Sequence, residues 1–355
     1  MRKLRSRAGI ALVVAGAMVA AAATGAAAAI PGNSFTVTPL VSTATDANLV
    51  NAWGLTAGPT TPWWVADNGT GVSTLYNGSG VKVPRTFTVG EDPTGAVFNG
   101  TGAFPVEGAP AAFIFATEGG EITAWQGTTG TMGTTAEPIP RPADGAVFKG
   151  LAIAQTAVGP RLYATDFHNS RVDVFDGSFQ PVNRPFAFFD PTVPRTFAPF
   201  GIQTIGNRVY VSYAKKPPPG SEDPNDEVHG TGLGFVDAFD PATGILQAKV
   251  AIAGLLNAPW GLAQAPAGFG RFGGDLLVGN FGDGTIDAYA PVLGGRFFVP
   301  MGQLRTPSGS RLAIDGLWAL QFGMGNANSG PTSTLFFTAG PEDESLGLFG
   351  TITSG

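Results

Sequence analysis

Four polar residues stand at equivalent places in a pattern that the chain repeats, each at the end of a run of apolar and β-branched residues. They are Asp67, Glu118, Asp166 and Asn280. Carboxylate and amide oxygens are the ligands that a hard cation such as Ca²⁺ prefers, so Asp67, Asp166 and Asn280 are candidate metal ligands. Glu118 is a candidate ligand-binding residue. The same groups can instead accept backbone N–H bonds in tight turns, and the sequence leaves both interpretations open.

The chain has two histidines, His168 and His229, and both fall in turns of this pattern. A neutral imidazole can act as a general base or as a metal ligand, so both are candidate catalytic residues. The alternative is that both rings are simply solvated. The sequence contains no cysteine and no Gly-x-Ser-x-Gly motif, so the familiar nucleophile signatures are missing.

Three aromatic residues, Trp53, Phe200 and Trp260, each directly precede a glycine that opens an apolar segment. Aromatic rings at the mouth of a channel can stack on a sugar or on an apolar ligand, which makes these three candidate ligand-binding residues. Packing between neighbouring structural units is the alternative interpretation.

The elements that must position these residues follow from the repeat itself. A glycine opens one apolar strand, a second strand ends in a polar residue, and a third strand follows a short turn and ends in an aromatic residue. A unit repeated every 40 to 60 residues or so indicates a propeller or a solenoid, and this unit consists only of strands. We therefore predict an all-β, six-bladed β-propeller, with residues 35–41 closing the ring as the outer strand of the last blade. The glycines expected to open the inner strands are Gly54, Gly95, Gly150, Gly201, Gly261 and Gly316.

Alternating strand directions place the turn between the second and third strands on the same face as the start of each inner strand. We call this the upper face, and we expect it to be acidic. It should also carry an insertion in the fourth blade, residues 214–230, which contains two lysines, four prolines and four acidic residues. A loop of this length predicts either a functional lid or a mobile solvated segment.

Residues 1–29 have the pattern of a cleaved secretory signal peptide, with four basic residues, a short apolar stretch and three alanines at the end. Removal of this segment leaves 16 basic against 26 acidic residues in residues 30–355, a net charge of −10. We expect residues 30–355 to form one propeller domain that is secreted or extracytoplasmic. We also expect the protein to be a monomer. This charge argues against binding to nucleic acid or to an anionic membrane.

Blade three contains Ala164-Thr-Asp166, Asn169-Ser-Arg171 and Val172 to Phe175, and this succession resembles the NHL repeat. The run from Trp64 to Tyr76 and the wider segment from about Phe35 to Ile352 resemble a family of exported bacterial propellers without an assigned activity. This resemblance implies a six-bladed NHL-like fold. Propellers similar to gluconolactonases hold a metal at the channel mouth with Glu, Asn and Asp. This sequence departs from them because Trp53 stands where their early Glu is expected.

Two functions remain open from the sequence. The first is an exported, non-enzymatic propeller that binds a small molecule, a glycan or a protein on its acidic upper face. The second is a metal-assisted hydrolase or lyase that uses the same face, with Ca²⁺ as its possible cofactor. We favour the first, because neither a nucleophile signature nor the early Glu is present.

Overall fold

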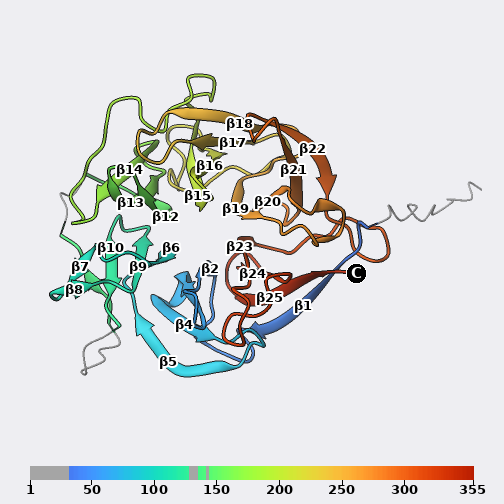
Figure 1. Ribbon diagram of the computed structural model, residues 1–355, viewed down its shortest axis with the longest axis horizontal. Coiled ribbons are helices and arrows are strands. Elements are labelled where there is room, and N and C mark those ends of the chain that lie inside the picture. The colour runs from blue at the N-terminus through green and yellow to red at the C-terminus, as the bar shows by residue number, and fades with distance from the viewer. Residues whose placement is uncertain (1–31, 128–134, 141–143) are drawn as a thin grey trace, which may run out of the picture.

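The fold is described from a computed structural model, which describes residues 32–127, 135–140 and 144–355. The predicted signal peptide, residues 1–29, lies outside these residues. The chain forms six small antiparallel sheets arranged around a central axis, and Figure 1 shows the chain passing from one blade to the next in sequence order. The prediction of an all-β, six-bladed propeller is confirmed.

The strands fall into four concentric positions within the blades. The inner strands are β2 (Ala52–Thr56), β6 (Pro93–Phe98), β12 (Phe148–Thr156), β15 (Phe197–Ile205), β19 (Pro259–Gln264) and β23 (Leu317–Phe322). The second strands are β3 (Trp63–Asp67), β9 (Phe113–Thr117), β13 (Gly159–Asp166), β16 (Arg208–Lys215), β20 (Leu276–Asn280) and β24 (Leu335–Ala339). The third strands are β4 (Val72–Tyr76), β10 (Ile122–Trp125), β14 (Arg171–Asp176), β17 (Gly234–Phe239), β21 (Ile286–Val292) and β25 (Leu348–Ser354).

Outer strands complete five of the six blades among the described residues. They are β5 (Lys82–Thr88), β11 (Glu137–Pro138), β18 (Leu246–Ile252), β22 (Phe297–Gln303) and β1 (Phe35–Ser42). In blade three the segment after β14 covers the open edge instead, where Val182 N donates a 2.8 Å hydrogen bond to Val174 O. Two further two-residue strands, β7 (Pro105–Val106) and β8 (Ala109–Pro110), form a hairpin in blade two. The helical segments are the short 3₁₀ turns η1 (Asn68–Thr70) and η2 (Gly270–Phe272).

The ring closes through the first described strand, as the sequence predicted. Strand β1 pairs antiparallel with β25, which makes Phe35–Ser42 the outer strand of the last blade. Figure 1 shows the blue β1 beside the red β25. Because β1 covers the edge of β25, the blade does not leave that strand open to pairing with another chain.

Apolar side chains between neighbouring blades hold the ring together. In one such cluster Ala152 and Tyr163 of blade three pack with Ile202 and Val209 of blade four. Burial of a side chain of this size contributes about 1.5–3 kcal/mol to the free energy of unfolding. Of the described helices, none is long and apolar enough to cross a lipid bilayer.

Each inner strand carries a register shift near its start, at the same point in all six blades. The shifts lie between Ala52 and Leu55, Pro93 and Ala96, Phe148 and Gly150, Pro199 and Ile202, Pro259 and Gly261, and Leu317 and Leu320. A bulge of this kind bends the strand and re-aims a side chain. The residues at this point are Trp53, Thr94, Lys149, Phe200, Trp260 and Trp318.

In five of the blades a glycine follows this residue and allows close packing of adjacent inner strands. A Cβ at Gly201, for example, would lie 2.1 Å from Trp260 O. In the sixth blade the register places Ala319 at this position, so the expectation that Gly316 plays this part is wrong. Gly316 precedes the strand, has a φ of +63°, and passes close to the backbone of Gly340.

Candidate functional site

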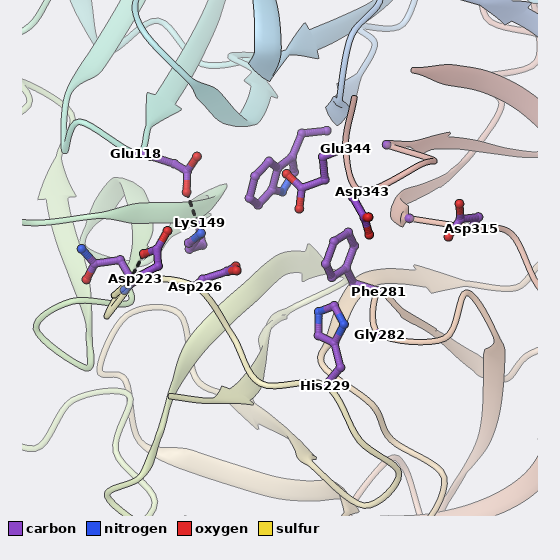
Figure 2. A pocket seen from close by; sticks show the side chains of 14 residues that line it. Glu118, Lys149, Asp223, Asp226, His229, Phe281, Gly282, Asp315, Asp343 and Glu344 are labelled. Carbon is purple, nitrogen blue, oxygen red and sulfur yellow. Dashed lines mark hydrogen bonds and ion pairs between the residues drawn. The ribbon is translucent and has the colours of Figure 1, made fainter. Parts of the chain in front are cut away.

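A cavity of about 480 Å³ opens at the upper face over the channel axis. Figure 2 shows the side chains that line it, which come from several blades. The lining is strongly acidic, with one lysine, one histidine and two aromatic residues. The lining residues are Trp53, Glu118, Lys149, Asp223, Asn225, Asp226, His229, Phe281, Gly282, Asp315, Gly316, Gly340, Asp343 and Glu344.

Two kinds of segment supply this lining. The turns after second strands contribute Glu118 after β9, Phe281 after β20 and Glu344 after β24. The inner strands contribute Trp53 and Lys149 at their bulges. The expectation that these two kinds of segment share one acidic face is therefore confirmed.

The blade-four insertion forms one wall of the cavity. It contributes Asp223, Asn225, Asp226 and His229. Val228 N donates a 2.8 Å hydrogen bond to Lys215 O, which fixes the insertion where it returns to its blade. The insertion is thus part of the cavity, in line with the lid interpretation.

Lys149 is the buried cation of the site. Its Nζ lies 2.6 Å from Glu118 Oε1, and the lysine side chain is 5% exposed against 28% for the glutamate. The same Nζ lies 5.3 Å from the centre of the Trp53 ring. Burial lowers the pKa of Lys149, but the surrounding carboxylates of Glu118 and Glu227 outweigh this effect and raise the pKa above its usual value. The lysine therefore stays protonated near neutral pH and provides the counter-charge of Glu118.

A chain of side-chain hydrogen bonds connects the Lys149–Glu118 pair to the opposite wall. Asn68 Nδ2 donates to Glu118 Oε2 at 3.1 Å, and Asn51 Nδ2 donates to Asn68 Oδ1 at 3.1 Å. Asn51 Nδ2 also donates to Glu344 Oε2 at 2.5 Å. Because these groups belong to three neighbouring blades, the chain fixes the carboxylates of the cavity relative to one another.

Glu344 is held in an unusual backbone conformation. Glu342, Asp343 and Glu344 have φ angles of 55°, 49° and 63°, which place three consecutive non-glycine residues in the left-handed region. Such residues cost of order 1 kcal/mol or more each and persist where the surroundings impose them. Burial, followed by the nearby Glu227 carboxylate, raises the pKa of Glu344 to about 7. This carboxyl group is therefore poised to exchange a proton near neutral pH.

His229 forms a second titratable pair with Glu227. Its Nε2 lies 3.5 Å from Glu227 Oε1, and the centroid of its ring lies 5.2 Å from that of the Phe281 ring. Burial raises the pKa of Glu227, and the hydrogen bond to Glu227 raises the pKa of His229. The structure therefore brings the candidate catalytic residue His229 into the cavity next to a carboxyl group.

His168 has a different position, because it is exposed and does not line the cavity. Its Nδ1 lies 2.9 Å from Asn225 Oδ1 of the insertion, and its backbone oxygen accepts a 2.8 Å hydrogen bond from Lys216 Nζ. These contacts connect the insertion to blade three. Thus the two histidines do not meet.

Aromatic rings close the channel beneath the cavity. The ring of Trp318 stacks on the rings of Trp53 and Phe281, with ring centroids 3.6 Å and 3.8 Å apart. It also contacts Trp260 and Phe200, whose ring centroids each lie 5.9 Å from its own. Trp53 also lines the cavity, whereas the candidates Phe200 and Trp260 are buried in this cluster.

The three candidate metal ligands lie in three separate blades and are completely buried. Asp67 Oδ2 accepts the backbone N–H of Thr74 at 3.0 Å. Asp166 Oδ1 accepts the backbone N–H of Asn169 at 3.0 Å, and Asn280 Oδ1 accepts that of Asn257 at 3.0 Å. These are the backbone-capping contacts of the alternative interpretation, and the three residues do not share a site.

One cluster among the described residues has the spacing needed for a metal ion. Ligand oxygens of Asp144, Asp166 and Asp173 lie within 4.8 Å of one another. Arg171 lies among them, with ion pairs of 2.5 Å to Asp144 and 2.6 Å to Asp173. Since a guanidinium already neutralises these carboxylates, they fit a metal ion only if Arg171 moves away.

Sequence reasoning missed Lys149 and Trp318. Each stands at the bulge of its own inner strand, the position that Trp53, Phe200 and Trp260 have in other blades. Lys149 could have been found there as the single charged residue in that position, directly before Gly150. Trp318 was missed because the sixth repeat was aligned on Gly316 rather than on Ala319.

The fold and the cavity define a six-bladed β-propeller with an acidic, ligand-sized mouth. The chain belongs to the same family as the uncharacterized protein R648 of Acanthamoeba polyphaga mimivirus, to which it is 31% identical over 323 residues, covering 87% of this chain and 76% of that protein. The uncharacterized protein L690 of the same virus is 28% identical over 86% of this chain and 81% of its own length. No family model matches the chain.

Solved structures with a similar fold share little sequence with this chain. Virginiamycin B lyase from Staphylococcus aureus is 13% identical, with a TM-score of 0.49 over 90% of this chain and 99% of that one. A gluconolactonase from Xanthomonas campestris is 14% identical, with a TM-score of 0.48 over 87% of each chain. These likenesses concern the fold and assign no activity. The relatives found by sequence are viral, so they do not support the exported bacterial origin that the resemblance implied.

Proposed function

We propose that the protein is a binding module that takes a small molecule or a small glycan unit into the cavity at its upper mouth, without a catalytic step. The observation that carries this proposal is the cavity of about 480 Å³ whose lining is mainly polar and includes six acidic side chains. Cavities for small ligands are usually a few hundred Å³ in volume, whereas a protein partner needs a broad surface. The hydrogen-bonded asparagines and the left-handed turn at Glu344 favour a preformed site, which lowers the entropy cost of binding.

The test is a ligand-observed NMR screen of a chemically broad library against three proteins. Asp226→Trp narrows the cavity, because Asp226 lines it from the insertion. Glu222→Trp is the matched control, since Glu222 is exposed on the same insertion and is not a lining residue. The proposal expects molecules that bind the wild-type protein and Glu222→Trp but not Asp226→Trp. A library without any hit, or hits that bind all three proteins equally, would contradict it.

An acid–base hydrolase or lyase in the same cavity is the second candidate. It is favoured by the pKa of Glu344, about 7, and by the neighbouring His229–Glu227 pair, because groups that titrate near neutrality suit general acid–base catalysis. Among the described residues, no three carboxylates or imidazoles of the mouth have ligand atoms within 4.8 Å of one another, so no metal-assisted step is assigned to them.

Calcium remains a cofactor proposal for the Asp166 cluster alone. Metal analysis and melting of the purified protein with Ca²⁺ or with a chelator test it. A bound cation that disappears in Asp166→Asn, with a large fall in melting temperature, would support a metalloprotein. Melting that does not respond to Ca²⁺ or to the chelator would exclude it.

The location and partners expected from the sequence stay proposals. The signal-like residues 1–29 support export. The net charge of −10 over residues 30–355 supports the absence of nucleic acid and membrane partners. Gel filtration with light scattering tests the expected monomer.

A further inference from the structure

The carboxylates of the cavity greatly outnumber its positive charges. Lys149 is already paired with Glu118. Within the described part of the chain, none of the other five lining carboxylates forms an ion pair with a lysine or an arginine. These five are Asp223, Asp226, Asp315, Asp343 and Glu344. Figure 2 shows Asp226, Asp343 and Glu344 around the same space. The cavity therefore has a negative potential that opposes anions and attracts cations.

The spacing of these carboxylates argues against a single metal ion as the missing cation. Among the described residues, the one group of three acidic or imidazole ligands within 4.8 Å of one another is the Asp144 cluster of blade three, outside the cavity. The mouth carboxylates are spread around a space of about 480 Å³. A cation with several charged or donor groups, distributed over a larger molecule, matches that spread better than one ion.

A buried carboxylate oxygen beside the cavity lacks a partner, which is an independent sign that a hydrogen-bond donor belongs there. Glu227, 7% exposed, bonds through Oε1 to the lining residue His229 but has no donor for Oε2. A buried acceptor without a partner is unfavourable, and a ligand that donates a hydrogen bond to Oε2 would remove that cost.

Blade three shows that a single guanidinium can neutralise several carboxylates of this chain at once. In blade three the guanidinium of Arg171 lies among Asp144, Asp166 and Asp173, at 2.5 Å, 3.7 Å and 2.6 Å. Groups with several N–H donors can bond to more than one carboxylate at a time, and these charge-assisted hydrogen bonds are strong. A quaternary ammonium has no N–H and cannot form them.

We infer that the ligand of the mouth cavity is a small organic cation that carries primary ammonium or guanidinium groups. This inference rests on the proposed function and narrows it to a ligand class. Such a ligand places N–H donors against Asp226, Asp343 and Glu344 over the aromatic floor. Lys149 lies below them and is already paired with Glu118, so it does not neutralise the negative charge of the other carboxylates.

The experiment is isothermal titration at low ionic strength and about pH 8, above the pKa of about 7 of Glu344, so that this carboxyl group is ionised. The probe is agmatine, which carries one amine and one guanidinium. The comparison probes are 1,4-butanediol (neutral), tetramethylammonium (no N–H) and succinate (an anion). The test variant combines Asp343→Asn with Glu344→Gln. The matched control is Glu137→Gln, which changes an exposed carboxylate on the outer strand β11. We expect agmatine to bind the wild-type protein and the control alike, and to bind the double variant at least about tenfold more weakly.

Three results would overturn the inference. They are no binding of agmatine, unchanged binding of agmatine by the double variant, and binding of the diol or of succinate as tight as that of agmatine. A neutral ligand whose binding is lost in Asp226→Trp would remove the cation inference and leave the proposed function standing. Agmatine binding that is unaffected by Asp226→Trp would contradict the proposed site itself.

Discussion

The Nζ of Lys149 lies 2.6 Å from Oε1 of Glu118, and the lysine is far more buried than the glutamate. Lys149 occupies the bulge position that holds an aromatic residue in four of the other five blades, so a charged group stands in a channel floor that is mainly aromatic. Through Asn68 and Asn51 this pair is connected to Glu344 on the opposite wall. The floor and the walls of the cavity therefore form one polar network.

Because Lys149 is more buried than Glu118, replacing the one residue or the other should lower the free energy of unfolding by different amounts. Glu118→Ala leaves a buried ammonium without its main partner, and we expect it to lower the free energy of unfolding by about 3 kcal/mol. Lys149→Met leaves the partly exposed Glu118 carboxylate to water, and we expect a loss of about 1 kcal/mol or less. Urea denaturation of the two variants provides the comparison. Equal losses, or a larger loss for Lys149→Met, would show that the pair does not act as described.

The raised pKa of Glu344 predicts that stability falls as the pH rises. The folded protein keeps the proton up to about pH 7, whereas the unfolded chain loses it near 4.5, so the folded state binds more protons between these values. The free energy of unfolding therefore decreases across this window, by at most about 3 kcal/mol from this group. His229, whose pKa is also raised, acts in the same direction above about pH 6.5.

Glu344→Gln should flatten this pH dependence, because glutamine does not titrate. Urea denaturation at about pH 5 and about pH 8 measures the change for both proteins. We expect the wild-type protein to lose more stability than the variant between the two pH values. A variant with the same slope as the wild-type protein would show that the Glu344 carboxyl group titrates at its ordinary pKa.

The close approach of neighbouring inner strands predicts a large loss of stability for one small substitution and a small loss for another. Gly201→Ala would place a Cβ 2.1 Å from the backbone oxygen of Trp260, so we expect a protein that is severely destabilised or does not fold. The reverse change in the sixth blade, Ala319→Gly, should cost about 1 kcal/mol or less, because it removes one methyl group and adds backbone freedom. Thermal melting distinguishes the two, and a well-folded Gly201→Ala protein would refute the packing described for the channel.

The anchors of the blade-four insertion predict that its tip can be removed. Replacement of residues 221–227 by two glycines keeps the contact between Val228 and Lys215, and that between Gly230 and Asn257. It also removes the buried carboxyl group of Glu227. We expect a circular dichroism spectrum and a melting temperature close to those of the wild-type protein, together with loss of ligand binding. Loss of the folded state would instead make the insertion a structural element.

Much of the architecture could be predicted from the sequence because packing between blades imposes the repeat. Each inner strand needs a small residue where its neighbour approaches, and strand β1 follows from its alternating pattern and from the need to close the ring. The sixth blade departs from this rule with Ala319, and that one departure concealed Trp318. The repeat in the sequence therefore predicts the blades, but it does not predict a residue such as Trp318, whose blade departs from the repeat.

The candidate site could be predicted only as a face of the molecule. The expected equivalence of Glu118 with Asp67 and Asp166 is wrong, because the register places Thr117 at their position and Glu118 one residue later. Asp67 and Asp166 therefore turn into their own blades, while Glu118 lines the cavity. The connection of Asn51 to Glu344 joins residues 293 positions apart, and no local pattern reports it.

The most direct test of the central claim is a calorimetric titration of the wild-type protein, Asp226→Trp and Glu222→Trp with the tightest-binding molecule from the screen. The account predicts saturable binding of one molecule per chain by the wild-type protein and by Glu222→Trp, and no measurable heat of binding with a folded Asp226→Trp. Equal binding by all three proteins would contradict the claim that the acidic mouth is the ligand site.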